Sequence, residues 1–214
     1  MISIKIFTFN AFQENTYLLY DETGEAIVID PGCYSKEEQK ALSGFISENN
    51  LKLKLLVNTH CHIDHIFGNY YVKQKYGVDL VCHEKEEVNL RSAKLFGQPF
   101  GFSDVDETEA EQYIEEGEEI RFGNSVLEVL FVPGHSPGHI ALLENAQKVC
   151  FSGDVLFRNS IGRTDLPGGD YQEILRSIRN KLFVLDDDIA VYPGHGPSTT
   201  IGHEKKHNPF LQNL

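Results

Sequence analysis

Apolar and polar side chains alternate at the start of the chain, where Ile2, Ile4 and Ile6 occupy every second position. This period of two predicts a β-strand with one buried face. Short apolar runs bounded by turn residues predict further strands. They cover residues 16–20, 26–30, 53–57, 79–82, 126–132, 140–143, 149–151 and 189–192.

Other segments carry their apolar residues at the helical period of about 3.6. Ser35 and Glu38 form a capping box that opens the first of these helices, and Asp170 and Glu173 open the last in a similar way. Further helices are predicted over residues 64–76, ending at Gly77, and over residues 84–95. The order of elements is strands, helix, strand, helix, strands, helix, strand, which predicts an α/β or α+β sandwich with helices covering sheets.

The length of 214 residues suits one large domain with a sizeable core. No Pro/Ser-rich linker, repeat or low-complexity tract divides the sequence, so we predict a single domain over residues 1–214. Residues 95–120 contain no Lys or Arg and carry many acidic side chains. We expect them on the surface, either as a solvated loop or as a flap over a pocket.

The balance of 19 basic and 32 acidic residues gives a net charge of -13. This charge argues against nucleic-acid partners and against binding to an anionic membrane surface. The first residues lack the order of a signal peptide, and no apolar run approaches the roughly 20 residues of a membrane helix. The four cysteines (Cys33, Cys61, Cys82 and Cys150) form no C-x-x-C pair. A cytoplasmic location with reduced thiols fits this pattern, and the oligomeric state stays open.

Residues 58–65 read NTHCHIDH and directly follow the strand predicted over 53–57. A polar turn at the start of a helix is one interpretation of this run. The other is half of a metal site, because His60, His62, Asp64 and His65 are four potential ligands within six positions.

Three other predicted strands end in the same way. Pro133-Gly134 leads to His135, Ser152-Gly153 leads to Asp154, and Pro193-Gly194 leads to His195. A glycine directly before the candidate ligand lets the backbone turn sharply or approach an ion closely. One such histidine alone would usually be an ordinary polar residue, but the repeated construction favours a shared metal site.

These five histidines and two aspartates exceed the three protein ligands and one water that a catalytic zinc ion takes. They suit two divalent ions, for which zinc is the first choice and iron or manganese is also compatible. Asp154 would bridge the ions with its two oxygens. One ion would take His60, His62 and His135, and the other would take Asp64, His65 and His195. Asp64 and Asp154 are thus the candidate catalytic carboxylates, and a metal-bridging hydroxide is the expected nucleophile.

Other residues near the candidate ligands have supporting roles in this interpretation. Arg158 and Arg163 are the cations nearest to Asp154 in sequence, so either could hold a substrate carboxylate. His139 is expected to support the site or pair with a strand rather than bind metal. Asp30, which ends a strand, either orients a ligand histidine or is an ordinary turn residue.

The motif T-H-x-H-x-D-H, which runs here from Thr59 to His65, resembles the signature of the metallo-β-lactamase superfamily. Essentially the whole chain shares the resemblance, including IVIDPG at 27–32, PGHSPGH at 133–139, SGD at 152–154, GRTD at 162–165 and YPGH at 192–195. The resemblance implies a four-layer αββα sandwich with a binuclear site at one edge between the sheets. The pattern looks most similar to small single-domain members of the glyoxalase II branch, which implies hydrolysis of a small-molecule thioester, as in hydroxyacylglutathione hydrolases.

Two departures limit what this resemblance implies about the substrate. Glyoxalase II enzymes have a helical C-terminal domain that contacts glutathione, whereas only residues 196–214 follow the last ligand here. Their Lys-x-Tyr contact to glutathione is also not evident, so the thiol carrier stays open. True β-lactamases lack the equivalent of His65, which disfavours antibiotic hydrolysis.

Alternative activities come from the same resemblance. Persulfide dioxygenases are similar to this branch, share a GRTD-like segment and use one iron held by two His and one Asp, so an oxidoreductase is the main alternative. A phosphodiesterase or nuclease of the superfamily is a further one, which the acidic surface weakens. The complete ligand set gives no reason to prefer metal binding without catalysis.

Overall fold

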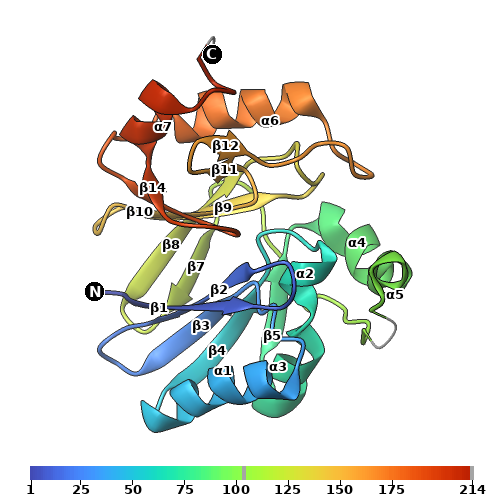
Figure 1. Ribbon diagram of the computed structural model, residues 1–214. Helices are drawn as coiled ribbons and strands as arrows, with labels where there is room; N and C mark the ends of the chain where they lie inside the picture. The colour runs from blue at the N-terminus through green and yellow to red at the C-terminus, as the bar shows by residue number, and fades with distance from the viewer. Residues whose placement is uncertain (103–104, 213–214) are drawn as a thin grey trace. The chain divides into compact units, whose positions relative to one another are not determined.

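The computed structural model describes residues 1–102 and 105–212. The chain divides into two compact units. The first contains residues 1–114 and 121–126, and the second contains residues 115–120 and 127–214. A six-stranded sheet is the centre of each unit (Figure 1). A single domain over residues 1–214 stays a prediction.

The sheet of the first unit has the strand order β1-β2-β3-β4-β5-β6. Its strands are β1 (Ser3–Phe9), β2 (Glu14–Tyr20), β3 (Glu25–Ile29), β4 (Lys52–Val57), β5 (Asp79–Cys82) and β6 (Gln112–Tyr113). β1, β2 and β3 pair antiparallel, whereas β3, β4, β5 and β6 pair parallel. Parallel neighbours need crossover connections, and helices supply them between β3 and β4 and between β4 and β5.

Helix α1 (Lys36–Glu48) makes the first crossover and confirms the predicted capping box. The N–H of Glu38 donates to Ser35 Oγ at 3.2 Å, and the N–H of Ser35 donates to Glu38 Oε2 at 2.9 Å. Leu42 and Ile46 pack with Leu56 of β4 in one buried cluster. Figure 1 shows α1 and α3 along this sheet, so the core of the first unit lies between these helices and the sheet.

The helix predicted over residues 64–76 is divided into α2 (Ile63–Ile66) and α3 (Asn69–Tyr76). Gly68 lies at the break, where its N–H donates to the carbonyl of Pro31 at 2.7 Å. A Cβ at Gly68 would lie 2.5 Å from Cys33 Sγ, so the close approach requires glycine. Gly77 ends α3 in the left-handed conformation with φ 63, as the sequence predicts. The break confines Asp64 and His65 to a short helix of their own.

The helix predicted over residues 84–95 is also interrupted. It consists of η1 (Glu84–Glu86), α4 (Glu87–Arg91) and α5 (Ala93–Gly97), and η2 (Gln98–Phe100) follows. The acidic segment 95–120 is more than a solvated loop, because Val105 and Thr108 are buried and β6 pairs with β5. Residues 103–104 of this segment lie outside the described residues.

The sheet of the second unit has the strand order β14-β13-β10-β9-β8-β7. Its strands are β7 (Glu119–Phe122), β8 (Ser125–Phe131), β9 (Ile140–Glu144), β10 (Val149–Gly153), β13 (Ala190–Pro193) and β14 (Thr199–Thr200). β10 pairs parallel with β13, whereas β8 with β9, β9 with β10 and β13 with β14 pair antiparallel. A separate hairpin consists of β11 (Leu156–Phe157) and β12 (Ser160–Ile161).

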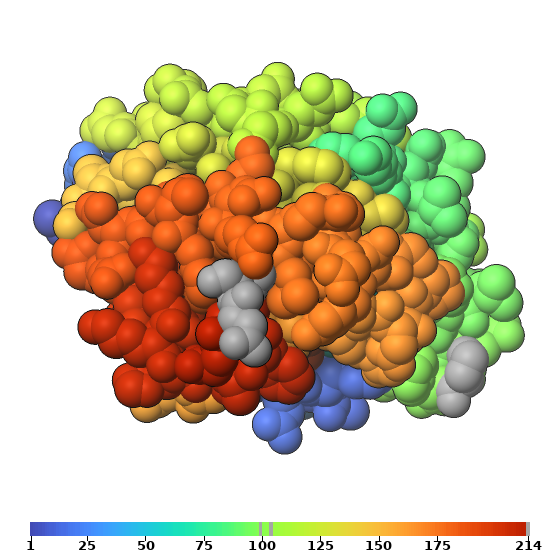
Figure 2. All heavy atoms as spheres, turned by 90° about the horizontal axis from the view of Figure 1, so that it is seen from above, coloured from blue at the N-terminus to red at the C-terminus, as the bar shows by residue number. Residues whose placement is uncertain are grey.

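Helix α6 (Tyr171–Ser177) continues into the π-helical turn η3 (Ile178–Leu182), and α7 (Ile201–His207) follows β14. Ile174, Ile178 and Leu182 are buried in the core of the second unit, which confirms the apolar face predicted for this helix. Figure 2 shows side chains of the α6 region in orange and of α7 in red on one face. The sequence did not predict α7, β7 or the two-residue strands, because such short elements carry no clear periodicity.

The four cysteines are free thiols and all are buried. Burial raises the pKa of Cys33 and of Cys150 to about 12. Within the described part of the chain, no helix is long and apolar enough to cross a membrane.

Asp21, at the end of β2, holds the turn between β7 and β8. Its carboxylate accepts hydrogen bonds from the N–H of Asn124 at 2.6 Å and from Ser125 Oγ at 3.0 Å. It also accepts the N–H of Thr23 at 2.9 Å and the Thr23 hydroxyl. Burial acts to raise the pKa of Asp21, but these hydrogen bonds outweigh burial and hold the pKa below its ordinary value.

We expect Asp21→Ala to lower the free energy of unfolding by about 2 kcal/mol, because one buried and three part-buried donors lose their acceptor. The contribution of the carboxylate to stability should be complete above the pKa of an aspartate in the unfolded chain, near 3.9. It should disappear as the pH falls through the lowered pKa of Asp21 in the folded protein. Urea unfolding of both proteins between pH 7 and pH 2 measures this. The control Glu22→Gln, at an exposed neighbour, should change stability much less than Asp21→Ala does. The assignment would be contradicted if the difference in free energy of unfolding between the wild type and Asp21→Ala were the same at every pH.

Candidate metal centre

The first group of candidate ligands follows β4 in the first unit. β3 and β4 are parallel neighbours, so the chain leaves both strands at the same edge of the sheet. The N–H of Asp30 donates to the carbonyl of Val57 at 2.9 Å, which fixes the exit of β3 beside the exit of β4. This register brings Asp30 next to the segment that carries His60, His62 and Asp64.

Asp30 is the acceptor that orders this segment. Its backbone is left-handed, with φ 47, and its side chain is buried. The carboxylate accepts the N–H of Thr59 at 2.7 Å, the Thr59 hydroxyl at 2.6 Å and Nδ1 of His65 at 3.1 Å. Of the two roles predicted for Asp30, orientation of a histidine is therefore confirmed.

Hydrogen bonds also determine which nitrogen His60 and His65 present. The Thr59 hydroxyl donates to Asp30, so its oxygen accepts from His60 Nδ1, which lies 3.1 Å away. With Nδ1 of both rings engaged in this way, Nε2 of each ring is the nitrogen suited to bind metal. Asp30, His60 and His65 each place one nitrogen or oxygen within 4.8 Å of the others.

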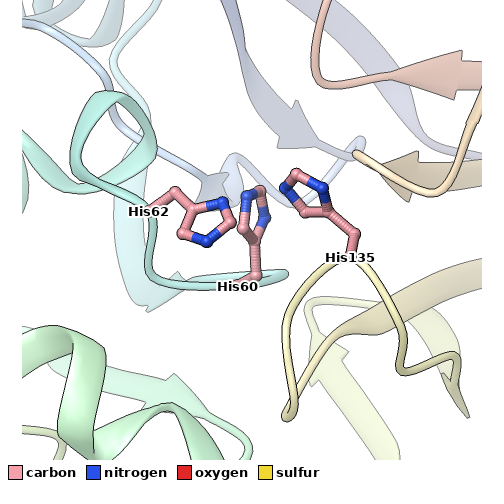
Figure 3. Close-up of side chains that lie close together, drawn as sticks. All are labelled: His60, His62 and His135. Carbon is pink, nitrogen blue, oxygen red and sulfur yellow. The ribbon is translucent and has the colours of Figure 1, made fainter. Parts of the chain in front are cut away.

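His62 and Asp64 complete the first group. His62 precedes α2 with extended backbone, and its ring centroid lies 4.8 Å from that of His60. Figure 3 shows His60 and His62 on the segment after β4. Asp64 Oδ2 lies 3.8 Å from Nε2 of His65. Asn10 Nδ2 donates to the carbonyl of Asp64 at 3.0 Å, which joins the β1–β2 loop to this helix.

Two buried carboxylates that the sequence analysis missed lie beside this group. Glu14 Oε1 lies 4.0 Å from Nδ1 of His65. Burial raises the pKa of Glu14 well above its ordinary value; His65 opposes the shift, and Asp30 adds to it. Glu86 Oε2 accepts the N–H of Cys61 at 2.8 Å. Burial raises the pKa of the Cys61 thiol.

The second group of candidate ligands lies in the second unit, after β8, β10 and β13. β10 and β13 are parallel neighbours, so Asp154 and His195 emerge at one edge of the sheet. The N–H of Gly194 donates to the carbonyl of Gly153 at 2.8 Å and fixes this pairing. Asp154 Oδ2 lies 3.4 Å from Nε2 of His195 and 3.6 Å from Nε2 of His135. One carboxylate oxygen therefore faces both histidines.

His135 and Asp154 are held by groups outside the ligand set. Nδ1 of His135 donates to the carbonyl of Arg163 at 2.8 Å, which leaves Nε2 as the nitrogen suited to bind a metal. The N–H of Asp154 donates to Nε2 of the buried His139 at 3.0 Å, so His139 supports Asp154, as predicted. A Cβ at Gly162 would lie 1.8 Å from the carbonyl oxygen of Asp154, and only glycine allows the segment to pass there.

Distances within each group fit a divalent ion. Ligand atoms at about 2.0–2.2 Å from a tetrahedral ion lie about 3.3–3.6 Å apart. The two distances around Asp154, 3.4 and 3.6 Å, match this spacing, and the 3.8 Å between Asp64 and His65 is slightly wider. Imidazole and carboxylate donors suit Zn, Fe and Mn alike.

The two candidate substrate-binding arginines are exposed. Arg163 forms two hydrogen bonds with the Asp165 carboxylate, at 2.7 and 2.8 Å. These bonds lower the pKa of Asp165 to about 2. Arg158 lies in the turn between β11 and β12. Arg163 also contributes its main-chain carbonyl to His135, which the sequence did not predict.

Comparison with known proteins agrees with these features. The family model described as "Metallo-beta-lactamase superfamily" matches residues 9–195, a range that contains both groups of candidate ligands. The chain belongs to this superfamily. Among curated proteins it is 42% identical to the hydroxyacylglutathione hydrolase GloC of Haemophilus influenzae over 98% of each chain.

Solved structures of similar proteins cover almost the whole chain. The B3 metallo-beta-lactamase BLEG-1 has a TM-score of 0.90 and 36% identity, covering 99% of this chain and all of its own. TTHA1623 in a di-iron-bound form has a TM-score of 0.86 and 33% identity, covering 97% of this chain and all of its own. The predicted fold class, an α/β metallo-β-lactamase fold with two sheets and covering helices, is therefore confirmed. Membership also makes the protein part of a superfamily of metal-dependent hydrolases.

The buried acidic residues had only weak signals in the sequence. Glu14 is a charged residue at the start of a strand whose next six residues are otherwise apolar or uncharged. Glu86 lies in a segment that reads as a charged helix, and four other acidic or basic residues surround it between residues 84 and 91. Only burial separates these two carboxylates from solvated neighbours, and burial depends on the tertiary structure.

We expect Asp30→Asn to weaken metal binding about 10- to 100-fold, because an amide has one acceptor oxygen where the carboxylate has two. Its NH2 group would face a donor, either Thr59 or His65. Competition with a chromophoric chelator measures the affinity, and thermal unfolding measures the accompanying loss of stability. Asp79→Asn is a matched control at an exposed aspartate of the same sheet. Equal metal affinity in Asp30→Asn and the control would contradict the role of Asp30.

Proposed function

We propose that this protein is a binuclear metallohydrolase that cleaves small thioesters. The observation that carries the proposal is the position of Asp154, whose Oδ2 faces Nε2 of both His135 and His195. The sequence assigns these two histidines to different ions, so a carboxylate between them is suited to bridge the ions. The 42% identity with a hydroxyacylglutathione hydrolase supports the same function.

In this proposal His60, His62, His135 and Asp154 hold one ion, and Asp64, His65, His195 and Asp154 hold the other. When bound, two divalent ions would activate water at neutral pH and stabilise negative charge on a carbonyl oxygen. The family match across residues 9–195 supports a shared site, since both ligand groups fall within it. The similar protein TTHA1623, described in a di-iron-bound form, supports the number of ions. We propose zinc as the first choice, with iron or manganese as the other candidates.

The leaving group favours a thioester over an amide. An amine must be protonated as it leaves, whereas a thiol with a pKa near 8.5 can leave as the thiolate. His139, the histidine nearest the ligands in sequence, already accepts the N–H of Asp154. The described ligand groups therefore offer no histidine assigned to protonating an amine. We propose a small 2-hydroxyacyl thioester as substrate, with weak dependence on the glutathione portion.

We expect the metal-loaded protein to hydrolyse a 2-hydroxyacyl thioester. Asp154→Ala should lower kcat at least about 10²-fold, the typical loss when charge stabilisation is removed. Release of free thiol from thioesters of glutathione and of a simple alkyl thiol measures the activity and the carrier preference. Asp188→Ala is a matched control, because Asp188 is exposed and pairs with Lys148. Metal analysis of each protein shows whether both ions are bound.

Three further substrates separate the alternatives. Oxygen consumption with a persulfide, in a protein with one iron and no thioesterase activity, would replace the hydrolase with the dioxygenase. Cleavage of a β-lactam without thioester cleavage would favour the chemistry named for BLEG-1. Cleavage of a phosphodiester alone would favour the nuclease alternative.

The substrate-binding role of Arg163 has its own test. We expect Arg163→Ala to raise KM about tenfold, the factor for an interaction of about 1.4 kcal/mol, with little change in kcat. The variant keeps the main-chain carbonyl that accepts from His135. Asp165→Asn, which removes the bidentate partner but keeps the guanidinium, should not raise KM. Arg158→Ala compares the second arginine, and a fall in kcat at unchanged KM in Arg163→Ala would contradict substrate binding.

A further inference from the structure

Glu14 is a fully buried carboxyl group that the proposed chemistry does not use. It is the first residue of β2, in the first unit, and it belongs to neither group of candidate ligands. Burying an ionisable side chain is unfavourable unless polar groups surround it. The side chain nevertheless lies directly behind a candidate ligand, so its surroundings indicate what it does there.

One oxygen of Glu14 belongs to a short chain of hydrogen bonds. Oε2 lies 2.8 Å from the hydroxyl of Thr16, and the same hydroxyl lies 2.8 Å from the carbonyl of Asp30. The Thr16 oxygen also accepts the N–H of Gly32 at 2.9 Å. Thr16 therefore connects Glu14 to the turn that sets the left-handed backbone of Asp30. The Thr16 hydroxyl thus also fixes the position of Glu14 itself.

The other oxygen of Glu14 faces His65. Oε1 lies 4.0 Å from Nδ1 of His65, on the nitrogen that Asp30 also contacts. Within the described part of the chain, this buried oxygen has no hydrogen-bond partner. A Cβ on Gly32 would lie 2.1 Å from Oε2, so the backbone of Gly32 closes the space on the other side. Glu14 is thus fixed between Gly32 and the imidazole ring.

We propose that Glu14 is a positioning residue for His65. Its Oε1 faces Nδ1 of the ring and its Oε2 is held by the Thr16 hydroxyl, so Glu14 keeps Nε2 of His65 directed at its ion. The consequence is selective. Binding of the ion assigned to Asp64, His65 and His195 depends on Glu14, whereas binding of the ion assigned to His60, His62 and His135 does not. This inference rests on the two-ion site of the proposed function but not on the identity of the substrate.

Glu86 supplies a matched comparison in the same unit. It is also a fully buried glutamate, and it accepts the N–H of Cys61, between His60 and His62. Asn89 Nδ2 donates to the same oxygen at 2.8 Å. The two glutamates therefore support opposite ends of one ligand segment.

The test compares Glu14→Gln with Glu86→Gln and with His65→Ala. An amide at Glu14 keeps the shape but either presents its NH2 to Nδ1 of His65 or loses the acceptor for Thr16. Stepwise competition with a chromophoric chelator, with zinc as the probe, measures the affinity of each ion. We expect Glu14→Gln to lower the affinity for one zinc ion about 10- to 100-fold, the range for groups that orient metal ligands. The affinity for the other ion should change by no more than about twofold.

A double-mutant cycle shows whether that ion is the one held by His65. In the His65→Ala background, Glu14→Gln should not change the affinity for the remaining ion further, whereas Glu86→Gln should still lower that affinity. Thr16→Val removes the hydroxyl that holds Glu14 Oε2, so it should reproduce the selective loss and should not add to Glu14→Gln. Thr16→Val also serves as the second variant if Glu14→Gln fails to fold, and circular dichroism checks each protein.

If Glu14→Gln lowers the affinity for both ions equally, or changes neither affinity, the assignment is overturned and Glu14 is a packing residue only. A Glu14→Gln effect that persists in full in the His65→Ala background would also overturn it. Metal affinity does not depend on the substrate, so this result is distinct from a failure of thioester hydrolysis. If the wild-type protein binds a single ion, the inference and the two-ion site fail together, whatever thioester activity it has.

Discussion

The Asp30 carboxylate, accepting hydrogen bonds from Thr59 and His65, is the interaction on which the first ligand group depends. It joins the end of β3 to the segment after β4, and it determines which nitrogen of His65 is presented to an ion. Through the Thr59 hydroxyl it also determines the nitrogen of His60. The parallel pairing of β3 and β4 makes this possible, since it brings the ends of both strands to one edge of the sheet.

The second unit uses a similar arrangement with different acceptors. Parallel β10 and β13 bring Asp154 and His195 together, and a main-chain carbonyl rather than a carboxylate fixes the ring of His135. The N–H of Asp154 is held by His139. Nδ1 of His60, of His65 and of His135 is engaged in this way, so each of these rings presents Nε2. The candidate metal-binding atoms are thus oriented by groups outside the candidate ligand set.

Buried acidic groups are the second theme of the first unit. Glu14, Asp30 and Glu86 are each buried, and each accepts hydrogen bonds from backbone or hydroxyl groups around the ligand segment. Such groups are unfavourable in an apolar interior unless they are hydrogen-bonded, so they stabilise the segment in one conformation only. A rigid ligand segment lowers the cost of ordering it when metal binds, which favours tight binding.

The sequence alone determined the strands that lead to the candidate ligands, the capping box at Ser35, the end of α3 at Gly77 and the family, because periodicity, turn residues and the His/Asp motif are local patterns. It did not determine the break at Gly68, which follows from the contact of its backbone with Pro31 and Cys33. It also left the role of Asp30 open and missed Glu14 and Glu86. A carboxylate at a strand end looks the same in sequence whether it is solvated or buried against an imidazole. Only the tertiary structure decides which neighbours from distant segments surround it, and those neighbours give the carboxylate its function.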